Sequence, residues 1–402
     1  MIKVSDSLDD VRVPAGFVFA STTAGIKQSG KPDLAIAFSP RSSVTAALFT
    51  TSRVVAAPVT VGREHLKRSG GRVQCVIVNS GNANCATGTS GERASRAICL
   101  KIARTLRCDA IQVIPSSTGI IGVPLPTEKI LAAIDNIETL EAGATDFQGF
   151  ARAIMTTDTR PKVASAQIKV GREIVRIAGA AKGAGMIHPN MATMLVYLFT
   201  DVAARRGPLQ KMFKEVADQT LNSISIDGDT STNDTALLLA SGASGIRLSK
   251  IEKQFRGALL RVCASLARQI VNDGEGVEHV VTLNISGAAT DEDARRAARA
   301  IANSPLVKTA WTGSDPNWGR MLAAIGSSGI RVEPDQVSIA IGPYQVCRRG
   351  AVARFDAAEA HAFMRQREYE ITISLGRGRG RCCFVTCDLS EEYVRINSEY
   401  ST

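Results

Sequence analysis

One threonine near the middle of the 402-residue chain stands where it could act as a nucleophile. Thr193 follows a glycine-rich polar segment, Lys182 to Asn190, and precedes an apolar run, Met194 to Phe199. A threonine hydroxyl is a weak nucleophile until a base removes its proton, and a free amine on the same residue can be that base. This amine would exist only after the Ala192–Thr193 peptide bond is broken. The residues therefore suggest a threonine that cuts its own chain and then carries an acyl group.

The plainer interpretation is that Thr193 is only the first residue of a buried strand. The residues around it favour the chemical interpretation, because residues 182–195, KGAGMIHPNMATML, resemble the self-cleaving segment of a known family. This is the ornithine acetyltransferase family, also called the glutamate N-acetyltransferases of arginine biosynthesis. Further segments match in the same order through residues 24–402: AGIKQSGKPDLA (24–35), NSGNAN (79–84), STGIIGVPLP (117–126), IMTTDTRPK (154–162), SIDGDTSTNDT (225–235), NDGEG (272–276), DPNWGR (315–320) and YVRINSEYST (393–402).

The resemblance implies a transferase with an N-terminal nucleophile. Self-cleavage between Ala192 and Thr193 would give two pieces, residues 1–192 and 193–402, which stay folded together with two of each in the assembly. Thr193 would take the acetyl group from N2-acetyl-L-ornithine and pass it to L-glutamate, a step of arginine biosynthesis in the cytoplasm. No cofactor is implied, and the use of acetyl-CoA as a second acetyl donor stays open. A related self-processing amidase or aminopeptidase, which hands its acyl group to water, is the alternative enzyme.

Acyl transfer passes through a tetrahedral oxyanion, so hydrogen-bond donors must be fixed where its charge develops. Ser117, Thr118 and Gly119 follow a strand-like run, and their hydroxyls and unhindered backbone suit this task. The same three residues would also fit a plain polar turn. The resemblance assigns the oxyanion hole to the Thr118 hydroxyl and the Gly119 N–H.

The resemblance also implies five substrate-binding residues besides Thr193. Lys182, among small residues that leave room for a ligand, suits a substrate carboxylate. Glu275 suits the ammonium group of ornithine, and Thr156 is a further substrate contact. Asn397 and Thr402 belong to a tail that would close the site. Taken without the resemblance, these residues would pass as solvated surface, turn, cap or frayed terminus.

Two other polar features are less promising for chemistry. His188 is the histidine nearest to Thr193, but the amine already fills the role of base and Pro189 favours a structural turn. The segment Asp227–Asp234 is rich in oxygen ligands, yet a calcium loop begun at Asp227 needs a glutamate at its twelfth position. A hydrogen-bonded structural loop is favoured there.

No metal site is expected from the cysteines. Cys382, Cys383 and Cys387 lack C-x-x-C spacing, and adjacent cysteines in a strand point to opposite faces. The nine cysteines are an odd, scattered set, which predicts reduced thiols. No apolar run reaches the roughly 18 residues of a membrane span, and no secretory signal is visible. These features favour a cytoplasmic enzyme without a membrane partner.

The net charge of +10 leaves an alternative of another class, a nucleic-acid-binding protein. Its candidate contact is the Arg-Gly segment 376–381. Aromatic residues are only 5% of the chain and do not alternate with these arginines, so a solvated hairpin loop is the favoured interpretation.

Strand-like runs and amphipathic helices alternate along the chain. Helices are expected from Thr89, with Glu92 at capping-box spacing, from Pro208, around Phe255 to Ile270, and from Thr290 with acidic residues in its first turn. A tight hairpin is expected at Gly171-Arg172. Such elements argue for sheets covered by helices, and the resemblance implies the α/β (α+β) class, an α/β/β/α layered sandwich with a further C-terminal lobe. Strands are predicted at 73–79, 110–114, 166–170, 174–177, 194–200, 236–240, 280–285, 337–341, 371–375 and 382–387.

Overall fold

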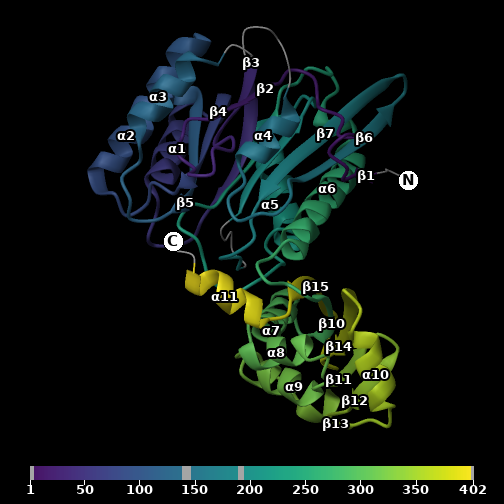
Figure 1. Cartoon of the computed structure of the whole chain (residues 1–402). Coiled ribbons are helices and arrows are strands. Elements are labelled where there is room, and N and C mark those ends of the chain that lie inside the picture. The colour runs from purple at the N-terminus through teal and green to yellow at the C-terminus, as the bar shows by residue number, and fades with distance from the viewer. Residues whose placement is uncertain (1–3, 138–145, 189–193, 400–402) are drawn as a thin grey trace.

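A large main body and a smaller C-terminal lobe make up the molecule (Figure 1). The computed structural model describes residues 4–137, 146–188 and 194–399. Ala192, Thr193 and Thr402 therefore lie outside the described residues. In this part of the chain, no helix is long and apolar enough to cross a membrane.

The main body is built on a nine-stranded sheet with the order β1-β6-β7-β8-β9-β3-β4-β5, to which β2 is added beside β3. The pairs β4–β5 and β8–β9 are parallel, and the other pairs are antiparallel. The strands are β1 (Val4–Ser5), β2 (Val18–Thr22), β3 (Leu34–Phe49), β4 (Arg72–Asn82), β5 (Val113–Ile120), β6 (Lys162–Val170), β7 (Glu173–Lys182), β8 (Leu195–Thr200) and β9 (Thr235–Ala240).

The long strand β3 joins the two halves of this sheet. Its residues 34–38 pair with β2 and β4, whereas residues 44–49 pair with β9. One core collects inward side chains from both halves, including Val76 of β4, Ala178 of β7, Tyr197 of β8 and Leu237 of β9. The two halves therefore face one another across a shared apolar layer, as two sheets of a sandwich do.

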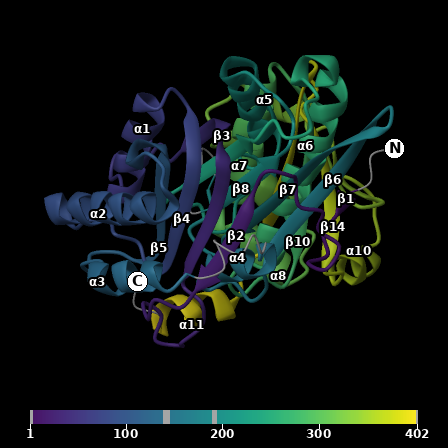
Figure 2. The same ribbon diagram turned by 90° about the horizontal axis from the view of Figure 1, so that it is seen from above.

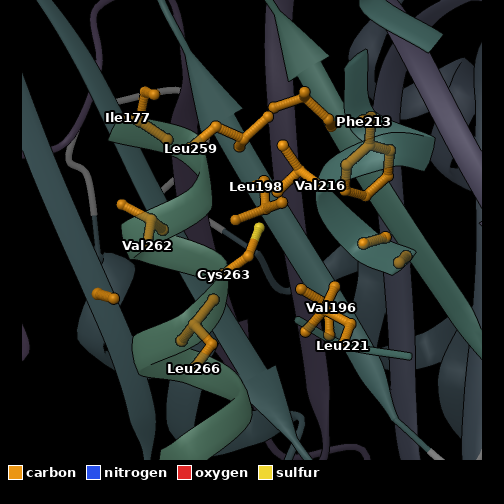
Figure 3. Packing of buried hydrophobic residues seen from close by; sticks show 14 of the residues in the cluster. Ile177, Val196, Leu198, Phe213, Val216, Leu221, Leu259, Val262, Cys263 and Leu266 are labelled. Atoms are coloured by element: carbon orange, nitrogen blue, oxygen red, sulfur yellow. The ribbon is translucent and has the colours of Figure 1, made fainter. Parts of the chain in front are cut away.

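Helices cover the two outer faces (Figure 2). On one side, α1 (Ala57–Arg68), α2 (Gly88–Leu106) and α3 (Thr127–Asp135) border a core that includes Cys75 and Ile77 of β4. On the other side, α5 (Arg206–Gln219) and α6 (Glu252–Asn272) pack onto β7 and β8 through Phe213, Leu259 and Leu266 (Figure 3). The short α4 (Phe147–Ala153) joins the inner core. The predicted α/β/β/α layering is confirmed, with one continuous sheet supplying both β layers.

The C-terminal lobe has its own six-stranded sheet, with the order β13-β12-β11-β14-β10-β15, and its own core around Trp311. The last helix, α11 (Glu391–Glu399), lies between the lobe and the main body (Figure 1). The remaining elements are β10 (Val280–Ala288), α7 (Asp291–Ala302), α8 (Pro305–Thr312), α9 (Trp318–Gly326), β11 (Ser338–Ile341), β12 (Tyr344–Arg348), β13 (Ala351–Val352), α10 (Ala357–Met364), β14 (Glu368–Ser374) and β15 (Gly380–Cys387).

Several local expectations hold. Residues 170 and 173 pair across the two-residue turn whose Gly171 has φ +63°, as a tight hairpin requires. The Thr290 side chain caps α7 by accepting the N–H of Asp293. The nine cysteines are all free.

Other local expectations are wrong. The α2 helix begins at Gly88 after Thr87, without a side-chain cap bond, so Thr89 is not its cap. The α5 helix begins two residues before Pro208. Residues 110–112 form the 3₁₀ helix η1 (Ala110–Gln112), because the Asp109 side chain accepts the N–H of Ile111, and β5 begins only at Val113. The Arg-Gly segment is not a hairpin loop, since β10 lies between the two strands that it connects.

Candidate active site

One cavity of about 340 Å³ gathers polar side chains from six separate parts of the chain. These parts are the end of β5, the turn after α4, the end of β7 with the following loop, the loop before β9, the loop after α6, and α11. The cavity therefore lies where the main body meets α11. Its lining residues are Thr118, Gly119, Thr156, Thr157, Lys182, Gly185, Met186, Asp227, Asp229, Glu275, Tyr393 and Asn397.

Lys182 and Thr118 are joined in the wall of this cavity. The ammonium of Lys182 donates to Thr118 Oγ1 over 3.1 Å, and both residues are almost fully buried. Because a charged lysine can only donate, the Thr118 oxygen acts as acceptor in this bond. The hydroxyl hydrogen of Thr118 is thus left to donate elsewhere, which is what an oxyanion-hole donor must do.

Gly119 makes the close contact between β4 and β5 possible. It has φ +131° and lies opposite Gly81 of β4. A Cβ at residue 119 would come within 2.3 Å of the backbone carbon of Gly81 and 2.5 Å of the Asn82 nitrogen. Only glycine fits both the conformation and the space, so the cavity-lining end of β5 depends on its missing side chain.

A buried ionic network holds the floor of the site. Lys162 has a fully buried side chain, and its ammonium lies 2.5 Å from Asp158 Oδ1 and 2.5 Å from Asp273 Oδ2. Asp158 also accepts the backbone N–H of Thr156 at 2.9 Å and of Gly183 at 2.7 Å. The turn that carries Thr156 is therefore tied to the end of β7, where Lys182 lies.

The charges of this network adjust the pKa values of their neighbours. Burial lowers the pKa of Lys182, while the carboxylates of Asp158, Glu275 and Asp234 act in the opposite direction. Burial would raise the pKa of Asp158, but the cations of Lys162 and Lys182 and the Gly183 N–H outweigh it and lower the pKa to about 2. Asp158 is thus a fixed anion beneath the cavity at neutral pH.

Asp227 shapes the loop that follows β7. Its carboxylate accepts the N–H groups of Met186, at 2.5 Å, and Ile187, at 2.9 Å, and the Tyr393 hydroxyl at 3.3 Å. Met186 has φ +54°, a conformation that costs free energy in a residue with a side chain and that Asp227 helps to hold. Burial raises the pKa of Asp227 to about 6.

Glu275 connects the loop after α6 with the last helix. Its backbone N–H donates to Ala184 O at 2.9 Å, and its Oε2 accepts Asn397 Nδ2 at 3.0 Å. A Cβ at residue 185 would lie 2.6 Å from the same Oε2, so Gly185 leaves room for the Glu275 carboxylate. The contact brings α11, which is otherwise exposed, to the cavity.

The strand β8 begins beside this cavity. Leu195 is opposite Lys182 in the β7–β8 register, and the N–H of Met194 donates to Asp234 Oδ1 at 3.1 Å. The neighbouring Asn233 donates to the carbonyl oxygens of Ala83, at 2.6 Å, and Ser117, at 2.8 Å. The loop before β9 therefore links the start of β8 to the strand end that carries Thr118.

Comparison with known proteins identifies the family. The ArgJ family model matches residues 18–402. The chain is 46% identical to the arginine biosynthesis bifunctional protein ArgJ of Thermus thermophilus, covering 98% of this chain and all of that protein. It is 42% identical to the protein of the same name from Caldanaerobacter subterraneus, covering 98% of each. The chain belongs to the ArgJ family.

A solved structure agrees with this assignment. The crystal structure of the ArgJ protein of Bacillus halodurans matches with a TM-score of 0.50 and 37% identity. The match covers 51% of this chain and 98% of the solved chain. The fold of an ArgJ-family chain is thus shared over about half of the present one.

The ArgJ-family structure brings six of the predicted site residues onto one cavity wall. Thr118, Gly119, Thr156, Lys182, Glu275 and Asn397 all line it, although they are spread over more than half of the sequence. Ala192, Thr193 and Thr402 lie outside the described residues. His188 is not among the lining residues; its Nδ1 contacts Asn303 Nδ2 at 3.1 Å, and burial lowers its pKa.

The sequence analysis did not predict four polar lining residues, Asp227, Asp229, Tyr393 and Thr157, the last of which directly follows the predicted Thr156. The sequence predicted a hydrogen-bonded structural loop for Asp227 and Asp229. Asp227 does hold the loop after β7 through its hydrogen bonds, and it also lines the cavity. Tyr393 lies one helical turn before Asn397, and this spacing placed beside the matched tail segment could have indicated it.

The remaining candidates lie away from this cavity. In the described residues, one group of possible metal ligands occurs, Glu278, His279 and Asp388, and none of them lines the cavity. Arg377 donates to the carbonyl of Arg331, and the N–H of Arg381 donates to Asp291. The Arg-Gly segment is thus held partly by contacts within the C-terminal lobe.

Proposed function

We propose that this ArgJ-family chain is an ornithine acetyltransferase that moves the acetyl group of N2-acetyl-L-ornithine to L-glutamate through an acetyl-Thr193 intermediate. The observation that carries the proposal is the assembly of six motif residues, from β5 to α11, around one cavity beside the start of β8. The relatives that match over nearly the whole chain are named as bifunctional proteins of arginine biosynthesis.

The charges of the cavity suit an amino acid. Lys182 supplies a cation at one part of the wall, and Asp227, Asp229 and Glu275 supply carboxylates at another. Among the described residues, the Lys182 ammonium has one hydrogen-bond partner, Thr118, so further donors are available to a substrate carboxylate. The α-carboxylate near Lys182 and the side-chain ammonium near Glu275 would orient N2-acetyl-L-ornithine, whereas glutamate would be held through a carboxylate near Lys182 while its α-amine stays free to react.

The chemistry needs two half-reactions at the same oxygen. The Thr193 hydroxyl attacks the acetyl carbonyl while its own amine takes the hydroxyl proton, and the proton then passes to the departing α-nitrogen of ornithine. The α-amine of glutamate next attacks the acetyl ester and frees Thr193. In both steps, Thr118 and Gly119 would donate to the oxyanion. No cofactor is needed for this exchange.

Self-cleavage at Ala192–Thr193 belongs to the proposal, because the amine of Thr193 exists only afterwards. We propose that residues 1–192 and 193–402 remain together as two copies of each piece, in the cytoplasm. The solved chain of the Bacillus halodurans relative matches 51% of this chain. This share is what a single piece of a cleaved chain would give. The use of acetyl-CoA as a second acetyl donor to glutamate is part of the same proposal.

The decisive test is Thr193→Ala. We expect this variant to stay a single chain of 42.6 kDa and to lose acetyl transfer, whereas the parent gives two pieces. Denaturing mass spectrometry reads the cleavage, and ornithine release with and without glutamate reads the transfer. The matched control, Thr89→Ala, changes an exposed threonine in α2 and should behave as the parent.

Three outcomes would contradict the proposal. An active or cleaved Thr193→Ala protein would remove the nucleophile. Release of acetate at the same rate with and without glutamate would indicate the alternative amidase. Salt-sensitive binding of nucleic acid that is lost on changing Arg377, Arg379 and Arg381, in a protein without transfer activity, would indicate the other class.

A further inference from the structure

Three side chains that could bind a metal ion meet where the chain enters and leaves the C-terminal lobe. Glu278 and His279 stand just before β10, and Asp388 directly follows β15. One ligand atom from each of the three residues lies within 4.8 Å of the other two. None of these residues lines the cavity of the proposed acetyl transfer, so the group is a separate feature of the molecule.

The Asp388 carboxylate has one oxygen bonded and one left over. Its Oδ1 accepts the backbone N–H groups of Glu278 and His279, both at 3.0 Å. Asp388 is only 3% exposed, and its Oδ2 is buried without a hydrogen-bond partner among the described residues. The buried ammonium of Lys308 donates instead to the carbonyl of Cys387. A buried carboxylate is costly unless it is paired or binds a metal, so Oδ2 calls for a cation or a donor.

The ring of His279 is oriented as in a metal ligand. Its Nδ1 lies 2.9 Å from the carbonyl oxygen of Gln366. Because a carbonyl oxygen can only accept, Nδ1 carries the proton, and in the neutral ring Nε2 then keeps its lone pair. The described residues supply no hydrogen-bond partner for Nε2. A backbone carbonyl behind the other ring nitrogen is a common partner of histidines that bind metals.

We propose that Glu278, His279 and Asp388 bind a divalent transition-metal ion of the zinc type. Nε2 of His279, Oδ2 of Asp388 and one oxygen of Glu278 would be its protein ligands, with water completing the shell. Two ligands of one zinc ion lie at most about 4.4 Å apart, because each lies about 2.0–2.2 Å from the ion. The present separation is slightly larger, and the exposed Glu278 side chain, which makes no hydrogen bond in the described residues, can turn to close it.

The charges and the surroundings of the group fit such an ion. The two carboxylates balance the two positive charges of the ion, and an imidazole favours zinc over Mg²⁺ or Ca²⁺, which prefer oxygen ligands. The ring of Tyr369 lies 6.1 Å from that of His279, and its hydroxyl is buried without a partner in the described residues. Burial raises the pKa of Tyr369, so this hydroxyl keeps its proton and would donate to a water on the ion.

An ion at this place would tie together the two crossings between the main body and the lobe. The crossings already share a backbone bond, in which the N–H of Asp388 donates to the carbonyl of His279 at 3.1 Å. Glu275 precedes Glu278 in the same loop, Tyr393 follows Asp388 in α11, and both line the cavity. The ion would therefore brace the loop after α6 and the start of α11 without taking part in acetyl transfer.

The test uses the full chain, treated with EDTA and dialysed, with Zn²⁺ as the probe. Isothermal titration should show one ion per chain, and Zn²⁺ should raise the temperature of thermal unfolding where Mg²⁺ and Ca²⁺ do not. Glu278→Gln should weaken zinc binding at least 10-fold, since even a group behind a ligand is worth roughly 10- to 100-fold. His279→Gln should weaken it further. Because Glu278 is exposed, its variant tests the site even if His279→Gln does not fold.

His361→Gln and Glu173→Gln are the matched controls. His361 also has its Nδ1 against a carbonyl oxygen, that of Ser314 at 2.9 Å, but its Nε2 contacts Arg365. Glu173 is an exposed glutamate at the start of β7. Both variants should bind zinc as the parent does. Co²⁺ in place of zinc should give its visible bands without thiolate-to-cobalt charge transfer, because no cysteine is a ligand.

Three results would overturn the inference. A parent protein that binds no zinc would leave the Asp388 oxygen to a water molecule. Equal zinc binding by the parent and Glu278→Gln, or a thiolate band with Co²⁺, would place the ion elsewhere. None of these results bears on the proposed acetyl transfer, which is read separately by mass spectrometry of the piece that begins at residue 193.

Discussion

Two buried lysines near the cavity differ in what they contact. Lys162 lies between the carboxylates of Asp158 and Asp273, so its charge is neutralised within the protein. Lys182 contacts the Thr118 hydroxyl, and its charged neighbours act on it without a direct ion pair in the described residues. The arrangement of Lys162 is typical of a structural ion pair, whereas that of Lys182 leaves its ammonium able to bind a ligand.

Asp158 gives a prediction for stability in acid. Its folded pKa of about 2 is below the ordinary value of 3.8, so its stabilising effect is complete above about pH 4 and is lost as the pH falls towards 2. The free energy of unfolding should lose about 2 kcal/mol over this range through Asp158 alone. Asp158→Asn should remove this part of the pH dependence, as measured by urea unfolding.

The control for this experiment is Asp10→Asn, which changes an exposed carboxyl. It should leave the pH dependence as in the parent protein. If Asp158→Asn and Asp10→Asn give the same curve, the buried network does not hold Asp158 in its ionised form.

The sequence predicted the site residues unevenly, and the reason is physical. Thr118, Lys182 and Glu275 stand in segments whose residue types match a family, so their approximate grouping could be predicted. The complete burial of Asp234 could not be predicted, because aspartate in a polar loop normally marks a turn and its burial depends on chain segments far away in sequence. Burial of a polar group follows from packing, which no local pattern reveals.

At the scale of elements, the pairing of β4 with β5 positions the proposed oxyanion hole. Gly119→Ala should cost at least 10²-fold in kcat, because the new methyl group would force the two strands apart and displace the Thr118 and Gly119 donors. Thermal unfolding should also occur at a lower temperature. Steady-state kinetics and calorimetry measure the two effects.

Gly122→Ala is the matched control. Gly122 also has a positive φ, +82°, but no atom lies within 4 Å of the position of its Cβ. The variant should therefore lose roughly 1 kcal/mol of stability from backbone strain and keep most of its activity. Equal losses of activity in the two variants would mean that the clash with β4 is not what matters.

Elements were predictable where the residue pattern is local. The runs that became β8 and β9 are wholly buried and almost entirely apolar, and both were predicted as strands. The longest strand, β3, was missed because Ser39, Pro40, Arg41 and Ser42 interrupt its apolar residues. The interruption coincides with the shift in register against β4, between Phe38 and Ser43, where a proline without an N–H is tolerated.

At the scale of the whole molecule, the two proposed pieces are interleaved. The strand β8 belongs to the second piece but lies between β7, from the first, and β9, from the second. One core joins Ile177 of β7 to Leu198 of β8 (Figure 3). The cleaved protein should therefore elute as one species under native conditions, as read by size exclusion with light scattering, and separate into two masses only in denaturant.

The uncut Thr193→Ala protein is the reference for this measurement and should elute at the same volume. An assembly with two copies of each piece predicts twice the 42.6 kDa of one chain. Separate native elution of the pieces would show that the sheet does not hold them.

The central place of β8 also sets an order of events. A strand bonded on both edges and covered by α5 and α6 would be difficult to insert after the rest of the sheet had closed. Folding must then come first and the cut last, so that the peptide bond serves as a tether during assembly and is dispensable afterwards. A single translation product delivers both halves in equal number, already in register, and the cell needs no separate means of matching their supply.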